Sequence, residues 1–157
     1  MAELNPAVIP LSLYIHMPWC VRKCPYCDFN SHAVPDGELS LELEQEYLHA
    51  LVEDFKTQFD FAQGRQIHSV FIGGGTPSLI SAQGYQWLFD QLQAIIPFAE
   101  GCEITLEANP GTVEHDPFAG YLQAGINRLS IGVQSFNTDH LKRLGRIHSN
   151  EDAISAI

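Results

Sequence analysis

Three cysteines lie close together near the N-terminus of this 157-residue chain. Cys20, Cys24 and Cys27 form a C-x3-C-x2-C triplet directly after an apolar, strand-like run. Thiolates are the usual ligands of iron–sulfur clusters, so three of them on one short loop can hold three corners of a [4Fe-4S] cluster. The fourth iron would then stay open for chemistry. The remaining cysteine, Cys102, lies in the strand-like run 102–106, and we expect it to be a core residue and not a ligand.

Two other interpretations of the triplet stay open. A structural zinc ion prefers two paired C-x2-C knuckles or cysteine–histidine pairs. His16 or His32 could complete such a site, although the x3-then-x2 spacing fits it poorly. The thiols could also be buried and bind nothing. Disulfides are not expected, because no signal peptide opens the chain and four cysteines in a domain of this size indicate metal binding or catalysis in a reducing compartment. We therefore predict a cytoplasmic protein.

The residues around the triplet and a later glycine-rich turn resemble those of radical S-adenosylmethionine (SAM) enzymes. The two segments are LYIHMPWCVRKCPYCDF at 13–29 and GGGTPS at 73–78, and the similarity runs from about residue 11 to the end of the chain. More narrowly, the chain resembles the oxygen-independent coproporphyrinogen III oxidase family. True oxidases of that family carry a further cysteine two residues after the triplet, where this chain has Phe29. The resemblance therefore points to the heme chaperone branch of the family.

This resemblance implies a [4Fe-4S] cluster on the three cysteines and SAM on the open iron. In an active member, reduction of the cluster cleaves SAM to a 5′-deoxyadenosyl radical. The chaperone branch is expected to bind heme and deliver it to heme-accepting proteins, with its heme ligands in sequence beyond this chain. The alternative is an oxidase that decarboxylates porphyrinogen propionates, so both readings predict a tetrapyrrole partner. A tRNA-modifying radical SAM enzyme is disfavoured by the acidic composition and the oxidase-like flanking residues.

The resemblance also implies which residues contact SAM. The glycine-rich turn lacks the Lys-Ser/Thr of a phosphate-binding loop, so alone it predicts only a close backbone approach. In the family it binds the amino-acid end of SAM through exposed backbone groups. Arg146 resembles the residue that meets the SAM carboxylate, which suits a fork-shaped guanidinium. The whole implied set is Tyr14, Tyr26, Gly74, Gly75, Thr76, Glu107, Gln134 and Arg146.

Three side chains near this set have competing structural interpretations. Glu107 ends a predicted strand, where a carboxylate is often functional, but an ion pair with Arg128 or Arg146 is the alternative. His16 and His148 are either hydrogen-bonded structural residues or axial and proton-handling groups.

The composition limits the partners of the chain. It has 19 acidic and 8 basic residues, a net charge of −11, which argues against a broad phosphate-binding surface and against nucleic acid as a partner. The few bases gather at 22–23 and 142–146, so local anion sites remain possible. The 45% of hydrophobic residues is ordinary for a globular domain, and no apolar run is long enough to predict a transmembrane segment.

Hydrophobic periodicity predicts alternating strands and helices. We expect strands at 12–17, 67–72, 102–108 and 128–133, and helices at 40–59, 81–96, 116–124 and from 138 onward. This order is typical of a parallel sheet with βαβ crossovers. The predicted fold class is α/β, the N-terminal part of a radical SAM partial TIM-type (β/α) barrel, since a closed barrel takes about 250 residues. Residues 1–10 are expected to be a lead-in, and 11–157 a radical SAM core that is incomplete at the C-terminus, because 151–157 reads as helix without a stop signal.

Alternation along the strands predicts which face meets the helices. Leu129, Ile131 and Val133 lie on one face of their strand, and equivalent apolar sets occur in the strands at 12–17 and 102–108. The opposite faces are expected to line the barrel interior. They place polar or aromatic side chains there, where a packed barrel core would carry branched apolar ones, so we predict a ligand cavity. The predicted interior set is Tyr14, His16, Glu107 and Gln134.

Overall fold

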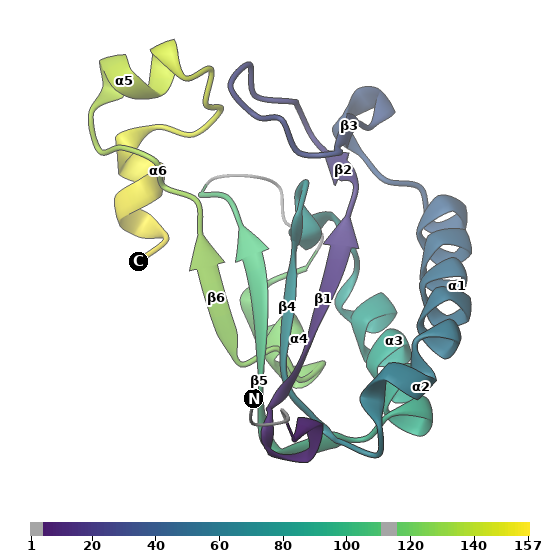
Figure 1. The fold of residues 1–157 in the computed structure, drawn as a ribbon. Coiled ribbons are helices and arrows are strands. Elements are labelled where there is room, and N and C mark those ends of the chain that lie inside the picture. Colours follow the sequence, from purple (N-terminus) through teal and green to yellow (C-terminus); the bar gives the residue numbers. More distant parts are fainter. Residues whose placement is uncertain (1–4, 111–115) are drawn as a thin grey trace.

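The computed structural model describes residues 5–110 and 116–157. Its centre is a four-stranded parallel sheet formed by β1 (Leu11–Met17), β4 (Ile67–Gly74), β5 (Phe98–Ala108) and β6 (Arg128–Ile131). The strands follow one another across the sheet in the order β1-β4-β5-β6. Each new strand is thus added on the same side of the previous one, as in a (β/α) barrel (Figure 1). The predicted α/β class and parallel sheet are confirmed.

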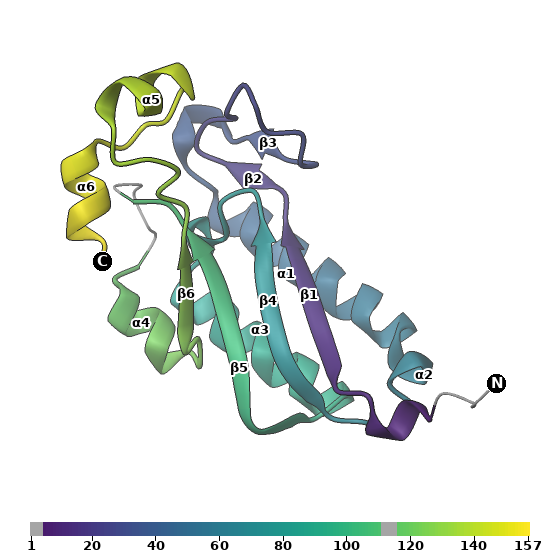
Figure 2. The same ribbon diagram turned by 60° about the vertical axis from the view of Figure 1, so that its left-hand side comes forward.

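Helices fill the crossovers between these strands. Helices α1 (Leu41–Thr57) and α2 (Phe59–Ala62) connect β1 to β4, α3 (Ala82–Ile95) connects β4 to β5, and α4 (Phe118–Gln123) connects β5 to β6. In Figure 2 the sheet lies in front of α1, α3 and α4, which therefore cover the same face. The opposite face is the one that the strand alternation assigned to the barrel interior.

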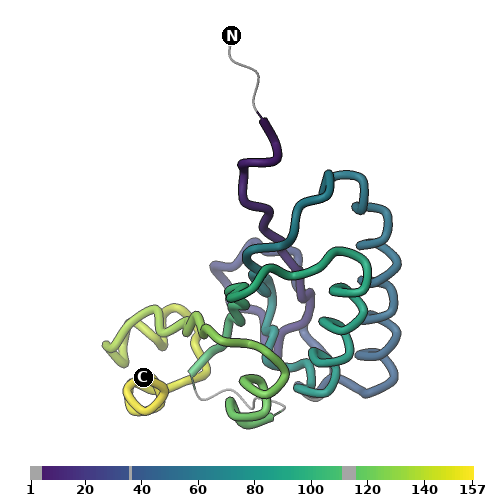
Figure 3. Tube along the Cα trace, turned by 90° about the horizontal axis from the view of Figure 1, so that it is seen from below, coloured from purple at the N-terminus to yellow at the C-terminus, as the bar shows by residue number. Residues whose placement is uncertain are grey.

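Shorter elements surround the C-terminal ends of the strands. A two-stranded parallel pair, β2 (Trp19–Cys20) and β3 (His32–Ala33), encloses the loop that carries the cysteines. The 3-10 turns η2 (Pro35–Gly37) and η3 (Pro77–Leu79) follow β3 and β4, whereas η1 (Pro6–Val8) precedes β1 and lies in the predicted lead-in. After β6 come α5 (Thr138–Arg143) and α6 (Asn150–Ser155). Seen from below, α5 and α6 lie on the opposite side of the molecule from α1 (Figure 3).

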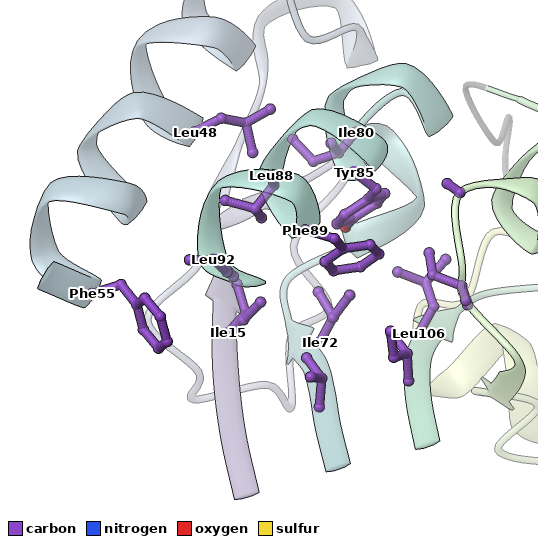
Figure 4. Close-up of a cluster of buried hydrophobic side chains, with 14 of the residues drawn as sticks. Ile15, Leu48, Phe55, Ile72, Ile80, Tyr85, Leu88, Phe89, Leu92 and Leu106 are labelled. Carbon is purple, nitrogen blue, oxygen red and sulfur yellow. The ribbon is translucent and has the colours of Figure 1, made fainter. Parts of the chain in front are cut away.

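The main core lies between the sheet and the helices (Figure 4). Ile15, Ile72 and Leu106 project from three neighbouring strands and are at most 5% exposed. They pack in the same cluster as Leu88 and Phe89 of α3 and the apolar face of α1. The apolar buried residues of α1 are Leu48, Val52 and Phe55, which recur at helical spacing. Burying side chains of this size contributes about 1.5–3 kcal/mol each.

Two carboxylates hold the first turn of α3. The Ser81 side chain caps the helix by accepting from the Gly84 N–H at 2.9 Å. Glu44 of α1, only 3% exposed, accepts from the Ser81 N–H at 2.9 Å and from the Ser81 hydroxyl at 2.6 Å. Asp116 accepts from the Ala82 N–H at 2.7 Å. The start of α3 is thereby fixed to two other parts of the chain.

Three of the differences from the predicted boundaries bear on the site or the core. Strand β6 ends at Ile131 and not at Val133, so Gln134 lies in the following loop. Strand β5 begins at Phe98, four residues early, and includes Cys102 as a partly buried residue. The predicted helix 40–59 is divided into α1 and α2. Within the described residues, no helix has both the length and the apolar character needed to cross a membrane.

Candidate functional site

A cavity of about 180 Å³ lies beyond the C-terminal ends of β4, β5 and β6. Its walls come from the cysteine loop, the glycine-rich turn, the end of β5, the loop after β6 and the segment between α5 and α6. The structure brings ten of the eleven predicted site residues together in this lining: Cys20, Cys24, Cys27, Tyr26, Gly74, Gly75, Thr76, Glu107, Gln134 and Arg146. The eleventh, Tyr14, lies outside it.

The glycine-rich turn is bonded to the segment that follows β1. The Gly75 N–H donates to the Met17 carbonyl and the Thr76 N–H to the Trp19 carbonyl, both at 2.6 Å. A Cβ on Gly75 would lie 2.2 Å from the Trp19 carbonyl oxygen, so a larger residue does not fit without a backbone shift. The sequence predicted that exposed backbone groups of this turn bind a ligand, and the structure limits which of these groups are free to do so. Because these N–H groups already donate within the chain, the turn can offer a ligand its carbonyl oxygens, which are acceptors.

Glu107 is held against the same turn. Its Oε2 accepts from the Gly74 N–H at 3.3 Å, and a Cβ on Gly73 would lie 2.8 Å from that oxygen. The absence of a side chain at Gly73, which sequence reasoning did not single out, gives the carboxylate its room. Arg128 forms its ion pair with Glu103 at 3.6 Å. The ion pairs of the described residues therefore do not include the alternative expected for Glu107, a pair with Arg128 or Arg146.

Arg146 reaches into the cavity from the segment after α5. One terminal nitrogen donates to the Asn109 side chain and to the Gly132 carbonyl, the latter at 2.8 Å. The other lies 3.5 Å from Cys24 Sγ and 3.4 Å from the Tyr26 hydroxyl. Arg146 Nε is buried and has no hydrogen-bond partner within the described residues. A buried donor without a partner is costly, so this N–H is a suitable group for a bound anion.

The cysteine loop is held mainly by contacts that the sequence did not predict. Lys23 Nζ donates to the carbonyls of Phe29 at 3.0 Å and Ser31 at 3.2 Å, which closes the loop on itself. His16 Nε2 meets the Asn30 carbonyl at 2.8 Å and ties the loop to β1. The sequence shows that Lys23 lies between two cysteines and that His16 lies in the preceding strand. It does not show which backbone carbonyls they bond, because any residue type can supply a carbonyl.

The three thiols stand at different depths in this loop. Cys20 is buried, whereas Cys24 and Cys27 are partly exposed. Within ranges 5–110 and 116–157, no three His, Cys, Asp or Glu side chains are gathered closely enough to ligate a single metal ion. The metal-binding role of the triplet remains a prediction.

His16 is a hydrogen-bonded structural residue. Because a carbonyl only accepts, the contact with Asn30 places the proton on Nε2, and Nδ1 then accepts from the Tyr14 hydroxyl at 3.0 Å. Tyr14 is 57% exposed and stacks on Phe71, with ring centroids 6.4 Å apart. Burial of its hydroxyl, and secondarily the charge of Glu107, raise the pKa of Tyr14. Tyr14 therefore lies on the interior face beside the cavity, close enough to sense Glu107.

His148 and Gln134 line the cavity from the segments that follow β6. His148 is 5% exposed, and its Nε2 donates to the Val133 carbonyl at 3.0 Å. Burial lowers the pKa of His148, so the imidazole is neutral near pH 7. Gln134 has φ of 64°, a left-handed conformation that is uncommon for residues other than glycine. Such strain is common at binding sites and fits the prediction that Gln134 contacts a ligand.

Known proteins share this sequence and fold. The family profile described as Radical SAM superfamily matches residues 14–157. "Heme chaperone HemW" of Escherichia coli (strain K12) is 56% identical over 144 residues, which is 92% of this chain and 37% of the relative. "Heme chaperone HemW" of Haemophilus influenzae is 54% identical over 156 residues, 97% of this chain and 40% of the relative. The chain thus spans about two fifths of these relatives.

A solved structure gives the same answer at the level of the fold. The coproporphyrinogen III oxidase HemN from Escherichia coli, a radical SAM enzyme, matches with a TM-score of 0.80 and 29% sequence identity. The match covers 96% of this chain and 34% of that protein. The likeness to the heme chaperones and to the oxidase is the one that the cysteine loop and the glycine-rich turn indicated. This chain belongs to the radical SAM superfamily.

Proposed function

We propose that the cavity binds a [4Fe-4S] cluster on Cys20, Cys24 and Cys27 with SAM beside it. The observation that carries this proposal is the convergence of five segments of the chain on one space that contains three thiols and the unpartnered Nε of Arg146. Three thiolates suit a cluster with one open iron, and the buried donor suits a carboxylate. The residues present therefore fit both groups.

Each wall has a distinct part in this proposal. Arg146 holds the carboxylate of SAM, while the carbonyl oxygens of the glycine-rich turn accept from its ammonium group. Glu107 and Gln134, which also line the cavity, add a carboxylate acceptor and an amide. When bound and reduced, the cluster would supply one electron to the sulfonium of SAM. The protein contributes placement and electrostatics.

For the longer protein we propose a heme chaperone that binds heme and delivers it to heme-accepting proteins. Phe29 supports this choice, because it lines the cavity and is 56% exposed at the position where the oxidases have a further cysteine. The names of the two bacterial relatives agree. The alternative is a coproporphyrinogen III oxidase, which the structural match to HemN keeps open.

The cluster is tested by anaerobic reconstitution of four single-alanine variants. Replacement of Cys20, Cys24 or Cys27 should abolish bound iron and sulfide and the visible absorption of the cluster, because each thiolate holds one corner. Cys102→Ala is the matched control, since Cys102 lies on β5 outside the cavity lining, and it should load normally. Full iron content in any triplet variant would refute the ligand assignment.

The choice between chaperone and oxidase needs the full-length protein. Reconstituted protein should bind heme stably and, with SAM and reductant present, should form protoporphyrinogen slowly or not at all. Phe29→Cys should not create the oxidase, because turnover depends on placement of the substrate by many residues. Rapid protoporphyrinogen formation by the unmodified protein would replace the chaperone proposal with the oxidase.

A further inference from the structure

The base of the cysteine loop is held by backbone pairing. In Figure 1 the loop extends from β2 and returns to β3 at the top of the molecule. The two strands are paired, and the Val34 N–H donates to the Cys20 carbonyl at 2.9 Å and the His32 N–H to the Pro18 carbonyl at 2.6 Å. This ladder includes Cys20 but not the two outer cysteines, so residues 21–31 depend on other contacts.

The side chain of Lys23 spans this outer part of the loop. Its Nζ donates to the Phe29 carbonyl at 3.0 Å and to the Ser31 carbonyl at 3.2 Å. We call these two hydrogen bonds the lysine clamp. Because its partners are six and eight residues further along the chain, the clamp closes a ring that encloses Cys24 and Cys27.

The other backbone bonds of this segment are local. The Cys27 N–H donates to the Cys24 carbonyl at 3.1 Å, and the Ser31 N–H donates to the carbonyl two residues before it at 2.8 Å. His16 contacts the loop from β1, at the Asn30 carbonyl near its outer end. The lysine clamp is therefore the contact that joins the part of the loop before the two outer thiols to the part after them.

The clamp also fixes a positive charge next to the thiols. Lys23 directly precedes Cys24, and its ammonium is engaged by carbonyls, which carry no net charge. No carboxylate in ranges 5–110 and 116–157 forms an ion pair with it. A fixed cation near an iron–sulfur cluster favours the reduced form, which carries one more negative charge.

We propose that Lys23 is a positioning residue for the iron–sulfur cluster. The clamp holds Cys24 and Cys27 at the spacing that the cluster needs, and the ammonium shifts the cluster toward its reduced form. This inference rests on the proposed function, because the thiols that the clamp encloses are the proposed ligands. Lys23 acts through the loop and through its charge, since an ammonium group has no lone pair with which to bind iron. The bond to the Phe29 carbonyl also fixes the backbone of a residue that lines the cavity.

Hydrogen–deuterium exchange on the full-length protein without its cluster tests the clamp. In Lys23→Met, which removes the donor and the charge, peptides covering 21–31 should exchange at least threefold faster than in the unmodified protein. Lys23→Arg keeps the charge and N–H donors, so its exchange should stay within twofold of the original. Lys56→Met, which removes an exposed charge on α1, is the matched control and should leave the loop unchanged. Unaltered exchange in Lys23→Met overturns the clamp, whether or not a cluster can be loaded.

Anaerobic redox titration of the reconstituted protein tests the charge. At a fixed potential near the midpoint, the ratio of reduced to oxidised cluster, measured by electron paramagnetic resonance, should be at least twofold lower in Lys23→Met. Lys23→Arg should restore this ratio, and Lys56→Met should not change it. Loss of iron to bathophenanthroline should be at least threefold faster in Lys23→Met, because the outer thiols are held less firmly.

These measurements separate the positioning role from the proposed function. A lower ratio and faster iron loss in Lys23→Met, with recovery in Lys23→Arg, support the positioning role. Normal clusters in all variants, with equal ratios, overturn that role and leave the proposed function standing. An equal change in Lys56→Met also overturns it, since the effect would then come from net charge alone. If the unmodified protein binds no cluster, the proposed function fails and the positioning role fails with it.

Discussion

Removal of the Arg146 guanidinium should weaken SAM binding by a defined amount. Its two terminal nitrogens are already engaged by protein groups, whereas Nε is buried without a partner. One free donor can add one charge-assisted hydrogen bond, which contributes about 1.5–3 kcal/mol. Arg146→Ala should therefore raise the dissociation constant of SAM by about 10- to 150-fold, since 1.4 kcal/mol corresponds to tenfold. Anaerobic equilibrium dialysis on reconstituted protein measures this change.

The design of this experiment separates lost recognition from lost structure. Arg143→Ala removes the same charge three residues away, on the exposed side of α5, and should leave SAM affinity unchanged. Arg146→Lys keeps the positive charge but lacks Nε and the fork, so its affinity should lie between those of the alanine variant and the original protein. Iron content should be normal in all three. Unchanged SAM affinity in Arg146→Ala, with a normal cluster, would show that the guanidinium only braces the cysteine loop.

Three further predictions concern the framework. Glu44→Gln should lower the free energy of unfolding by about 1.5–3 kcal/mol in urea titrations, because a buried charged acceptor is lost. Glu46→Gln, on the exposed side of α1, is the control and should leave the stability unchanged. Equal stabilities of the two variants would refute the role of Glu44 at the start of α3. Gly75→Ala should destabilise by about 1–3 kcal/mol, because its Cβ meets the Trp19 carbonyl at 2.2 Å, and a neutral result would show that the turn relaxes freely. Burial lowers the pKa of His148, so the unfolded chain binds a proton there more readily than the folded chain does. The free energy of unfolding should therefore fall as pH drops below about 6.5. His148→Asn should flatten this dependence in unfolding curves recorded from pH 5 to 8, and an unchanged slope would contradict the prediction.

Local patterns in the sequence predicted much of the fold and the membership of the site. Alternation in β1 and β5 identified the faces that meet the helices, because burial on one side of a strand imposes a period of two. Cysteine spacing and the glycine-rich turn placed chemistry at the ends of two neighbouring strands. Parallel strands end at the same edge, so groups separated by dozens of residues meet in one cavity.

The sequence did not predict contacts whose partner is a backbone group. The carbonyls that receive Lys23 and His16, and the pairing of Gly75 with Met17, depend on how the loop closes in three dimensions. Tyr14 was predicted only in part. Alternation placed it correctly on the interior face of the sheet, but it does not show how far along the strand the cavity begins. Its hydroxyl is directed to His16 and not into the cavity lining. The length of β6 was also overestimated, since Val133 continues an apolar pattern that the ladder does not follow.

Hydrogen bonds hold the segment that follows the glycine-rich turn, and this affects the order in which the cavity and its ligands come together. Tyr85 donates to the Pro77 carbonyl, Tyr121 donates to the carbonyls of Ser78 and Ile80, and α3 begins directly afterwards on its two carboxylates. This wall loses little conformational entropy when a ligand arrives, because it is ordered as the chain folds. The cysteine loop is also held within the chain, by Lys23 on the carbonyls of Phe29 and Ser31 and by His16 on the Asn30 carbonyl. Both walls should therefore form as the chain folds, before the thiols are loaded and a small molecule binds.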